Sequence, residues 1–215
     1  MSEFRVARER MVERLRAAGL AGEAVLGAMA ELPRHRFVEP ALGRRAYGRD
    51  SLPIGHDQTL SHPEVVAFMT ESLHLAPGQR ILEVGTGSGY QAALLCLLGA
   101  AVWTVERIAP LLGGARAAWA ALGLDGRIRA RVGDGHAGWP EGAPYDRVLV
   151  TAAPREVPPA LLAQLAEGGS LILPLDGGGG QRLVRVRREG ERAFREDLGA
   201  CSFVPMRART VGESP

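Results

Sequence analysis

Residues 81–90 read Ile81-Leu82-Glu83-Val84-Gly85-Thr86-Gly87-Ser88-Gly89-Tyr90, a short apolar run followed by a glycine-rich turn. The apolar run predicts a buried strand, and the residues after the turn favour a helix. Backbone N–H groups are free at the start of a helix, and glycine lets a ligand approach the main chain closely. We therefore expect a strand, a turn and a helix here, with a small ligand bound at the turn.

On both sides of this segment, strand-like and helix-like stretches alternate. We expect strands over 80–84, 101–105, 128–132, 147–151 and 170–175, and helices over 63–73, 90–98, 108–122 and 158–166. This alternation predicts right-handed βαβ units, and therefore an α/β protein with a doubly wound, mainly parallel sheet and helices on both faces. Two further strands, 183–186 and 200–204, have no helix between them and predict an antiparallel pair at one edge.

An N-terminal appendage of helices and loop precedes the alternation. Apolar residues at three- and four-residue steps predict helices over 3–18 and 21–31. The stretch 32–63 is broken by prolines and glycines and predicts a long irregular loop, which is uncommon unless it builds a site. The 215 residues fit one domain. Within it, we expect helices and a substrate-side loop over 1–60, a ligand-binding core over 61–206 and a tail over 207–215.

Composition narrows the class of protein. The 26 basic and 24 acidic residues leave a net charge of +2, which is too small to indicate a nucleic acid or an anionic membrane as partner. Two distant cysteines, Cys96 and Cys201, predict no disulfide framework and fit a reducing compartment. The N-terminus carries charges throughout and does not resemble an export signal. We expect a cytoplasmic monomer that contacts neither nucleic acid nor membrane.

The positions of glycines and acids favour one kind of ligand. A dinucleotide fingerprint needs glycine at its sixth position, where this chain has Tyr90, so a pyrophosphate is disfavoured. Glu106 ends the second strand, where a carboxylate is placed to accept both hydroxyls of a ribose. Asp134 follows the third strand and is placed to accept from an adenine amino group. With Glu83, these acids suit a cationic adenosine compound without phosphates, and S-adenosylmethionine is such a compound.

Further motifs make the sequence similar to one family. From about Phe37 to Met206 the chain resembles the protein-L-isoaspartate O-methyltransferases, which are class I S-adenosylmethionine-dependent methyltransferases with a Rossmann-like sheet. Most class I methyltransferases share the glycine-rich and acidic elements. The elements typical of this family are Pro53-Ile54-Gly55, Gln58-Thr59-Leu60-Ser61 and Phe203-Val204-Pro205.

The resemblance implies an activity and a set of site residues. The activity is methyl transfer from S-adenosylmethionine to the α-carboxylate of L-isoaspartyl residues in damaged proteins and peptides, which starts repair through a succinimide. A carboxylate is already ionised at neutral pH, so no general base is needed. The implied catalytic residue is Ser61, which would hydrogen-bond the acceptor carboxylate. The implied cofactor-binding residues are Glu83, Gly85, Thr86, Gly87, Ser88, Gly89, Glu106, Arg107, Asp134 and Gly135. The implied substrate-binding residues are Pro53, Ile54, Gln58, Thr59, Leu60, Ser61, Val204 and Pro205.

For several individual residues, more than one role stays open. Ser61 or His62 can cap the helix that Pro63 begins, which is a purely structural role. Asp57 and His62 depart from the family pattern, and we expect Asp57 to face solvent. With His56 they match no metal-ligand spacing, so no metal is expected. The arginines between 182 and 195 predict a solvated edge strand rather than a nucleic-acid site.

Three rival hypotheses about the function also remain. A methyltransferase that acts on a nucleic acid or a small metabolite is the nearest, but residues 151–154, Thr-Ala-Ala-Pro, lack the Asn/Asp-Pro-Pro-aromatic and Pro-Cys motifs of base methyltransferases. An NAD-dependent oxidoreductase is disfavoured by Tyr90 and Glu83. A non-catalytic S-adenosylmethionine-binding module can be separated from an enzyme only by measuring turnover.

Overall fold

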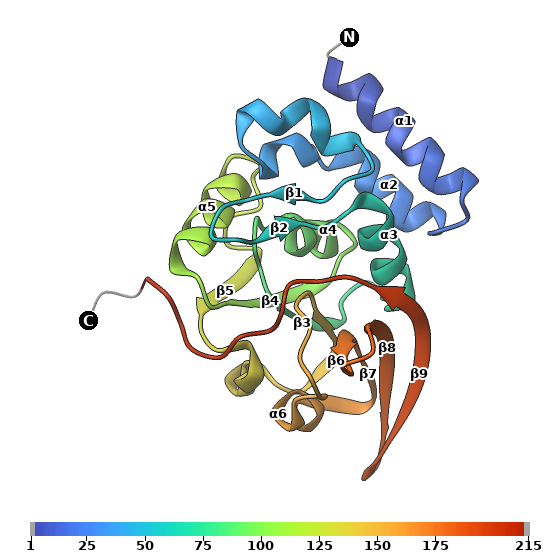
Figure 1. The fold of residues 1–215 in the computed structure, drawn as a ribbon, viewed down its shortest axis with the longest axis vertical. Helices are drawn as coiled ribbons and strands as arrows, with labels where there is room; N and C mark the ends of the chain where they lie inside the picture. The colour runs from blue at the N-terminus through green and yellow to red at the C-terminus, as the bar shows by residue number, and fades with distance from the viewer. Residues whose placement is uncertain (1–2, 213–215) are drawn as a thin grey trace.

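The N-terminal part of the chain forms a helical layer beside a central sheet (Figure 1). The computed structural model describes residues 3–212. The two predicted helices are present as α1 (Glu3–Ala17) and α2 (Glu23–Glu31). Their apolar stripes are buried, with Met11 and Leu15 of α1 and Leu26 and Met29 of α2 each at most 1% exposed. Periodicity alone therefore located this layer.

The stretch 32–63 is more ordered than the sequence predicts, and the expectation of one irregular loop is wrong. It contains two 3-10 helices, η1 (Arg34–Phe37) and η2 (Pro40–Tyr47), and a hairpin of two short strands, β1 (Leu52–Pro53) and β2 (Thr59–Leu60). Each of these elements is held by a few local backbone hydrogen bonds. None is long enough to show a hydrophobic period, which explains why the sequence did not reveal them.

The hairpin turns at His56 and Asp57. Gln58 N donates to Gly55 O at 2.9 Å, and φ is +52° at His56 and +57° at Asp57. Two successive positive φ angles are the geometry of a type I′ turn, which matches the twist of paired strands. Both turn residues are exposed, so the expectation that Asp57 faces solvent is confirmed.

Seven strands form the central sheet of the described residues, in the order β5-β4-β3-β6-β7-β8-β9. Their bounds are β3 (Arg80–Val84), β4 (Ala101–Glu106), β5 (Ile128–Val132), β6 (Tyr145–Val150), β7 (Leu165–Asp176), β8 (Gln181–Glu189) and β9 (Arg192–Cys201). The pairs from β5 to β7 are parallel, and β7-β8-β9 are antiparallel. Strand order reverses between β3 and β6, which confirms the doubly wound, mainly parallel α/β fold and marks a ligand-binding position.

Side chains alternate between the two faces of the sheet. On one face, Ile81, Leu149 and Ile172 pack with the buried sides of α1, α2, α3 (Pro63–Ser72), α4 (Tyr90–Leu97) and α5 (Ala109–Ala120). On the other face, Leu82 and Leu171 pack with α6 (Pro159–Ala163) and the segments near η3 (Gly135–Ala137) and η4 (Pro140–Gly142). Helices therefore cover both faces, as predicted, but most of them lie on one.

The expected antiparallel pair at one edge of the sheet is confirmed, but its two strands have other bounds than 183–186 and 200–204. β8 is longer than predicted and lies inside the sheet, and β9 ends at Cys201 and forms the edge. The arginines of β8 therefore do not form the edge strand that was expected. Arg182 pairs with Asp197 at 2.9 Å and Arg185 with Glu196 at 2.7 Å, so acids of β9 neutralise them.

Residues 202–212, here called the C-terminal strap, run back across the carboxyl ends of the parallel strands (Figure 1). Ala153 N donates to Val204 O and Met206 N to Ala153 O, both at 2.8 Å, and Val211 N donates to Arg107 O at 2.7 Å. The strap includes residues 207–212 of the predicted tail, and 213–215 lie outside the described residues. Backbone hydrogen bonds thus hold the strap over the sheet edge.

Two further expectations concern the cysteines and the membrane. Both cysteines are free thiols, and Cys96 is buried in the core. No helix between residues 3 and 212 combines the length and apolar character needed to cross a bilayer.

Candidate active site

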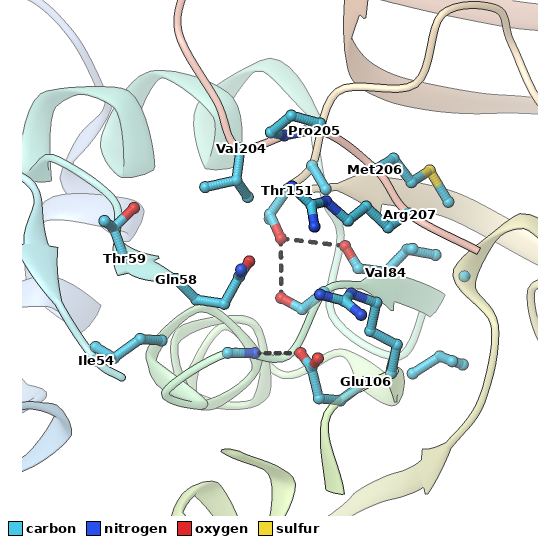
Figure 2. A pocket seen from close by; sticks show the side chains of 16 residues that line it. Ile54, Gln58, Thr59, Val84, Glu106, Thr151, Val204, Pro205, Met206 and Arg207 are labelled. Atoms are coloured by element: carbon cyan, nitrogen blue, oxygen red, sulfur yellow. Dashed lines mark hydrogen bonds between the residues drawn. The ribbon is translucent and has the colours of Figure 1, made fainter. Parts of the chain in front are cut away.

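A cleft opens at the carboxyl ends of β3, β4 and β6, where the strand order reverses (Figure 2). Its empty space is about 570 Å³, open solvent included. The residues that line it are Ile54, Gln58, Thr59, Val84, Gly85, Gly87, Val105, Glu106, Arg107, Gly135, Thr151, Ala152, Val204, Pro205, Met206 and Arg207.

The glycines after β3 serve different purposes. Gly85 has φ +97°, and a Cβ there would collide with the hydroxyl of Thr151, so glycine allows the ends of β3 and β6 to come together. Gly87 lines the cleft opposite Ile54. Gly89 has φ +86°, and a Cβ there would lie 2.7 Å from Trp119 Nε1. The reason for glycine at position 89 is therefore helix packing rather than contact with a ligand.

Glu106 joins the glycine-rich loop to the end of β4. Its Oε2 accepts from Gly87 N and its Oε1 from Ile108 N, both at 2.9 Å. The side chain lines the cleft although the residue is only 5% exposed (Figure 2). A carboxylate oxygen has two lone pairs, so each oxygen retains acceptor capacity for the hydroxyls of a ribose.

Glu83 lies behind the cleft rather than in it. It is 0% exposed, its Oε2 accepts from Thr104 Oγ1 at 2.5 Å, and Thr104 Oγ1 also pairs with Thr86 Oγ1 at 2.6 Å. Burial raises the pKa of Glu83 to about 8, and the nearby charge of Glu106 adds to this. At neutral pH Glu83 is therefore mainly an uncharged acid that supports the loop through the two threonines.

Asp134 follows β5 and caps the short helix η3. Its Oδ1 accepts from His136 N at 2.9 Å, and its Oδ2 accepts from Arg209 N of the C-terminal strap at 3.4 Å. Burial acts to raise the pKa of Asp134, but the hydrogen bonds from His136 outweigh it and lower this pKa below its ordinary value. The cleft itself is lined at this point by Gly135.

The two predicted substrate segments come together at the cleft. Ile54, Gln58 and Thr59 come from the β1–β2 hairpin, and Val204 and Pro205 come from the strap (Figure 2). Segments about 150 residues apart in the chain thus form one wall. The other two hairpin residues predicted to bind substrate are placed differently, since Pro53 is exposed on the surface and Leu60 is buried in the core.

Ser61 links the hairpin to α3 and is half-buried, two residues beyond the cleft-lining Thr59. The cap of α3 is His62, whose Nδ1 accepts from Glu64 N at 3.1 Å. The residue that caps α3 is therefore His62, and not Ser61. The carbonyl of Ser61 accepts from Arg34 Nη2 at 2.5 Å.

The sequence did not single out several lining residues. The single hydroxyl proton of Thr151 is shared between Gly85 O at 2.8 Å and Val84 O at 3.1 Å, and thereby joins the ends of β3 and β6 (Figure 2). Its position at the end of a predicted strand could have identified Thr151 as a lining residue. Met206 and Arg207 had no such signal, because they lie in the strap. Arg207 and Arg107 line both the cleft and a smaller pocket beside it.

The remaining predicted residues do not gather into a metal centre or a second site. Thr86 is buried, and Ser88 lines a neighbouring groove on the other side of the hairpin. Among the described residues, no three His, Cys, Asp or Glu side chains are grouped so as to hold a metal ion.

Comparisons with known proteins give a consistent result. Residues 6–211 match the profile of a family described as protein-L-isoaspartate(D-aspartate) O-methyltransferase. Relatives named protein-L-isoaspartate O-methyltransferase are 50% identical in Methylorubrum populi, over 96% of this chain and 97% of the relative, and 50% identical in Hahella chejuensis, over 93% and 94%. A solved structure of the same name has a TM-score of 0.84 and 28% identity over 96% of this chain, which spans 66% of that longer chain.

Proposed function

The chain belongs to the protein-L-isoaspartate O-methyltransferase family, and we propose that the cleft between the β1–β2 hairpin and the C-terminal strap is its active site. The enzyme transfers a methyl group from S-adenosylmethionine to the α-carboxylate of L-isoaspartyl residues in proteins and peptides. The methyl ester can then close to a succinimide, and part of the succinimide hydrolyses to normal aspartate. This is the chemistry of protein repair.

The residues of the cleft fit S-adenosylmethionine. The carboxylate of Glu106 points into the cleft and has acceptor capacity for a ribose, and Gly85 and Gly87 leave the main chain open to close approach. We assign Asp134 and Gly135 to the adenine and Arg107 to the rim of the same site. When bound, S-adenosylmethionine supplies a methyl group activated by a sulfonium. Glu83 and Thr86 contribute by supporting the loop from behind.

The contribution of the protein is placement and exclusion of water. The acceptor carboxylate is already ionised at neutral pH, so the chain has no proton to remove. Its task is to hold the acceptor oxygen in line with the methyl carbon and the sulfur, and to shield the three atoms from water. The hairpin and the strap cover the cleft from two sides, which is the arrangement that such a reaction requires (Figure 2).

We assign substrate binding to the wall formed by Ile54, Gln58, Thr59, Val204 and Pro205. We expect the peptide to contact mainly the backbone of the hairpin and of the strap, and backbone contacts tolerate many side chains. Discrimination then depends on the path of the substrate main chain, which isoaspartate lengthens by one methylene. Ser61 follows the hairpin directly, and its hydroxyl is free from helix capping, so we assign it the hydrogen bond to the acceptor carboxylate.

We further propose that residues 1–215 act as one catalytic domain, as a cytoplasmic monomer. Both cysteines are free, as in a reducing compartment. A rival activity on nucleic-acid bases is disfavoured by the end of β6, where the Thr151 hydroxyl is bound to Val84 O and Gly85 O and presents no base-reading amide or thiol.

The observation that carries the proposal is the meeting of the hairpin and the strap over the Glu106 side of the cleft. A radiolabelled methyl-transfer assay on matched isoaspartyl and aspartyl peptides tests it. We expect incorporation into the isoaspartyl peptide alone. Equal incorporation into both peptides, or labelling of nucleic acid in their place, would contradict the assignment.

A further inference from the structure

We propose that Arg34 is a positioning residue for the acceptor carboxylate, because it fixes the main chain of Ser61 and places a buried positive charge beside it. This inference rests on the proposed role of Ser61. Arg34 belongs to η1 and does not itself line the cleft.

The contacts of Arg34 join three separate segments. The residue is 0% exposed. Its Nε donates to Ala46 O at 2.7 Å and its Nη2 to Ser61 O at 2.5 Å. The guanidinium carbon lies 4.8 Å from the centroid of the Tyr90 ring, which is a cation–π contact. One side chain thus connects η2, the residue after the hairpin, and the first residue of α4.

This arrangement relates the acceptor side of the cleft to its cofactor side. Tyr90 follows Gly89 directly, so it is anchored to the glycine-rich loop. Ser61 is held by Nη2 of the same guanidinium. Arg is suited to this task because its planar group donates in fixed directions. Loss of Arg34 would therefore free the Ser61 carbonyl and change the position of Ser61 relative to the loop.

The charge of Arg34 has no counter-ion among the described residues. Its Nη1 atom and the hydroxyl of Tyr90 are both buried; the nearby Tyr90 side chain favours the charge of Arg34, but neither atom makes a hydrogen bond of good geometry. A buried cation without an opposite charge is unfavourable. Burial accordingly lowers the pKa of Arg34 from its ordinary value. An anionic acceptor at Ser61 supplies the opposite charge, so binding of the isoaspartyl carboxylate gains from a cation already in place.

The cofactor loop does not depend on Arg34 for its shape. Gly87 N is held by Glu106, and Gly89 O accepts from Trp119 Nε1 at 2.9 Å. Substitution of Arg34 is therefore expected to affect the peptide more than the cofactor. This difference separates a positioning role from a general role in stability.

The test compares Arg34→Met and Arg34→Lys with Arg36→Met, an exposed residue of the same 3-10 helix. For each folded variant, KM and kcat are measured with an isoaspartyl peptide, and the Kd of S-adenosylhomocysteine is measured by calorimetry. We expect Arg34→Met to raise the peptide KM by about tenfold or more, while the S-adenosylhomocysteine Kd stays within about twofold. Arg34→Lys keeps the charge and one donor, and should recover part of the loss. Arg36→Met should match the wild type.

The outcomes separate this inference from the proposed function. A wild-type enzyme without turnover on the isoaspartyl peptide would overturn both. Wild-type turnover with an unchanged peptide KM in Arg34→Met, or a loss that follows the loss of S-adenosylhomocysteine affinity, would overturn the inference alone. If Arg34→Met does not fold, Arg34→Lys decides, because a folded lysine variant with wild-type KM and kcat would contradict the positioning role.

Discussion

The backbone amide of Gly87 donates a 2.9 Å hydrogen bond to Oε2 of Glu106, which ties the loop after β3 to the last residue of β4. The other oxygen of the same carboxylate accepts from Ile108 N at the start of α5. Glu106 therefore shapes the cofactor loop while it faces the cleft. Its substitution should affect both binding and stability.

Replacement of Glu106 by alanine should weaken the binding of S-adenosylmethionine by at least about tenfold, since a charged hydrogen bond contributes about 1.5–3 kcal/mol. It also leaves two backbone amides without their acceptor, so the free energy of unfolding should fall by about 1–3 kcal/mol. Glu106→Gln keeps one acceptor oxygen and should lose less of each. Calorimetry and thermal unfolding measure the two effects, and an alanine variant with unchanged cofactor affinity would refute the assignment.

Asp134 should show a graded response to substitution. Asparagine preserves an oxygen that accepts from His136 N, so the turn after β5 keeps its shape and one bond to the adenine amino group stays available. Alanine preserves neither. Asp134→Asn should therefore bind S-adenosylmethionine more tightly than Asp134→Ala, as measured by calorimetry. The reverse order would argue against contact between Asp134 and the adenine.

Glu83 should make the wild-type protein less stable as the pH rises from mildly acidic to mildly basic. In the unfolded chain its carboxyl ionises near pH 4.5, whereas in the folded chain its pKa is about 8. Between these values the unfolded state binds fewer protons, so stability falls with rising pH. At about 1.4 kcal/mol per pH unit, the loss from this group between pH 6 and pH 8 is on the order of 2 kcal/mol.

Glu83→Gln has nearly the same shape and cannot ionise, so its unfolding free energy should lack this component. Chemical denaturation of both proteins at pH 6 and pH 8 checks the prediction. The advantage of the glutamine variant should grow at the higher pH. A constant difference between the two proteins would show that Glu83 does not change its protonation in this range.

Ser61 should act as a hydrogen-bond donor and not as a nucleophile. Ser61→Ala should lower turnover by about 1–3 kcal/mol of transition-state stabilisation and leave cofactor affinity unchanged. Ser61→Thr retains a hydroxyl and should keep more activity than alanine. Mass spectrometry of the enzyme incubated with S-adenosylmethionine alone should find no methyl group on Ser61. A methylated serine would replace direct transfer with a covalent route.

The strand, loop and helix around residues 80–97 could be predicted because a continuous apolar run, a glycine-rich turn and a helical pattern are all local signals. The β1–β2 hairpin could not, since its strands have two residues each and show no period. Val204 and Pro205 could be assigned to the site through the family motif, but the course of the strap could not be predicted. Backbone hydrogen bonds hold it at Ala153 and Arg107, and these leave no trace in the side chains of residues 202–212.

Among the candidate site residues, too, some roles could be predicted from the sequence and others could not. Glu83 and Glu106 are both acids near strand ends, and sequence position suggested one role for both. Glu106 is the last residue of β4 and reaches the cleft, whereas Glu83 lies one residue inside β3 and points into the interior of the protein. Glu83 is in register with Thr104, two residues before Glu106, so both acids lie on the same face of the sheet and only their distance from the strand ends decides between them. Arg34 could not be predicted as part of the site, because its partners lie 12 and 27 residues away in the chain.

The most direct measurement of the central claim follows one isoaspartyl peptide and its aspartyl twin by mass spectrometry after addition of enzyme and S-adenosylmethionine. The isoaspartyl peptide should gain one methyl group, then lose methanol as the succinimide closes, and finally yield some normal aspartyl peptide. The aspartyl twin should stay unmodified. Methylation of the twin at the same rate, or a methyl group that is never released as methanol, would contradict carboxyl methylation directed at isoaspartate.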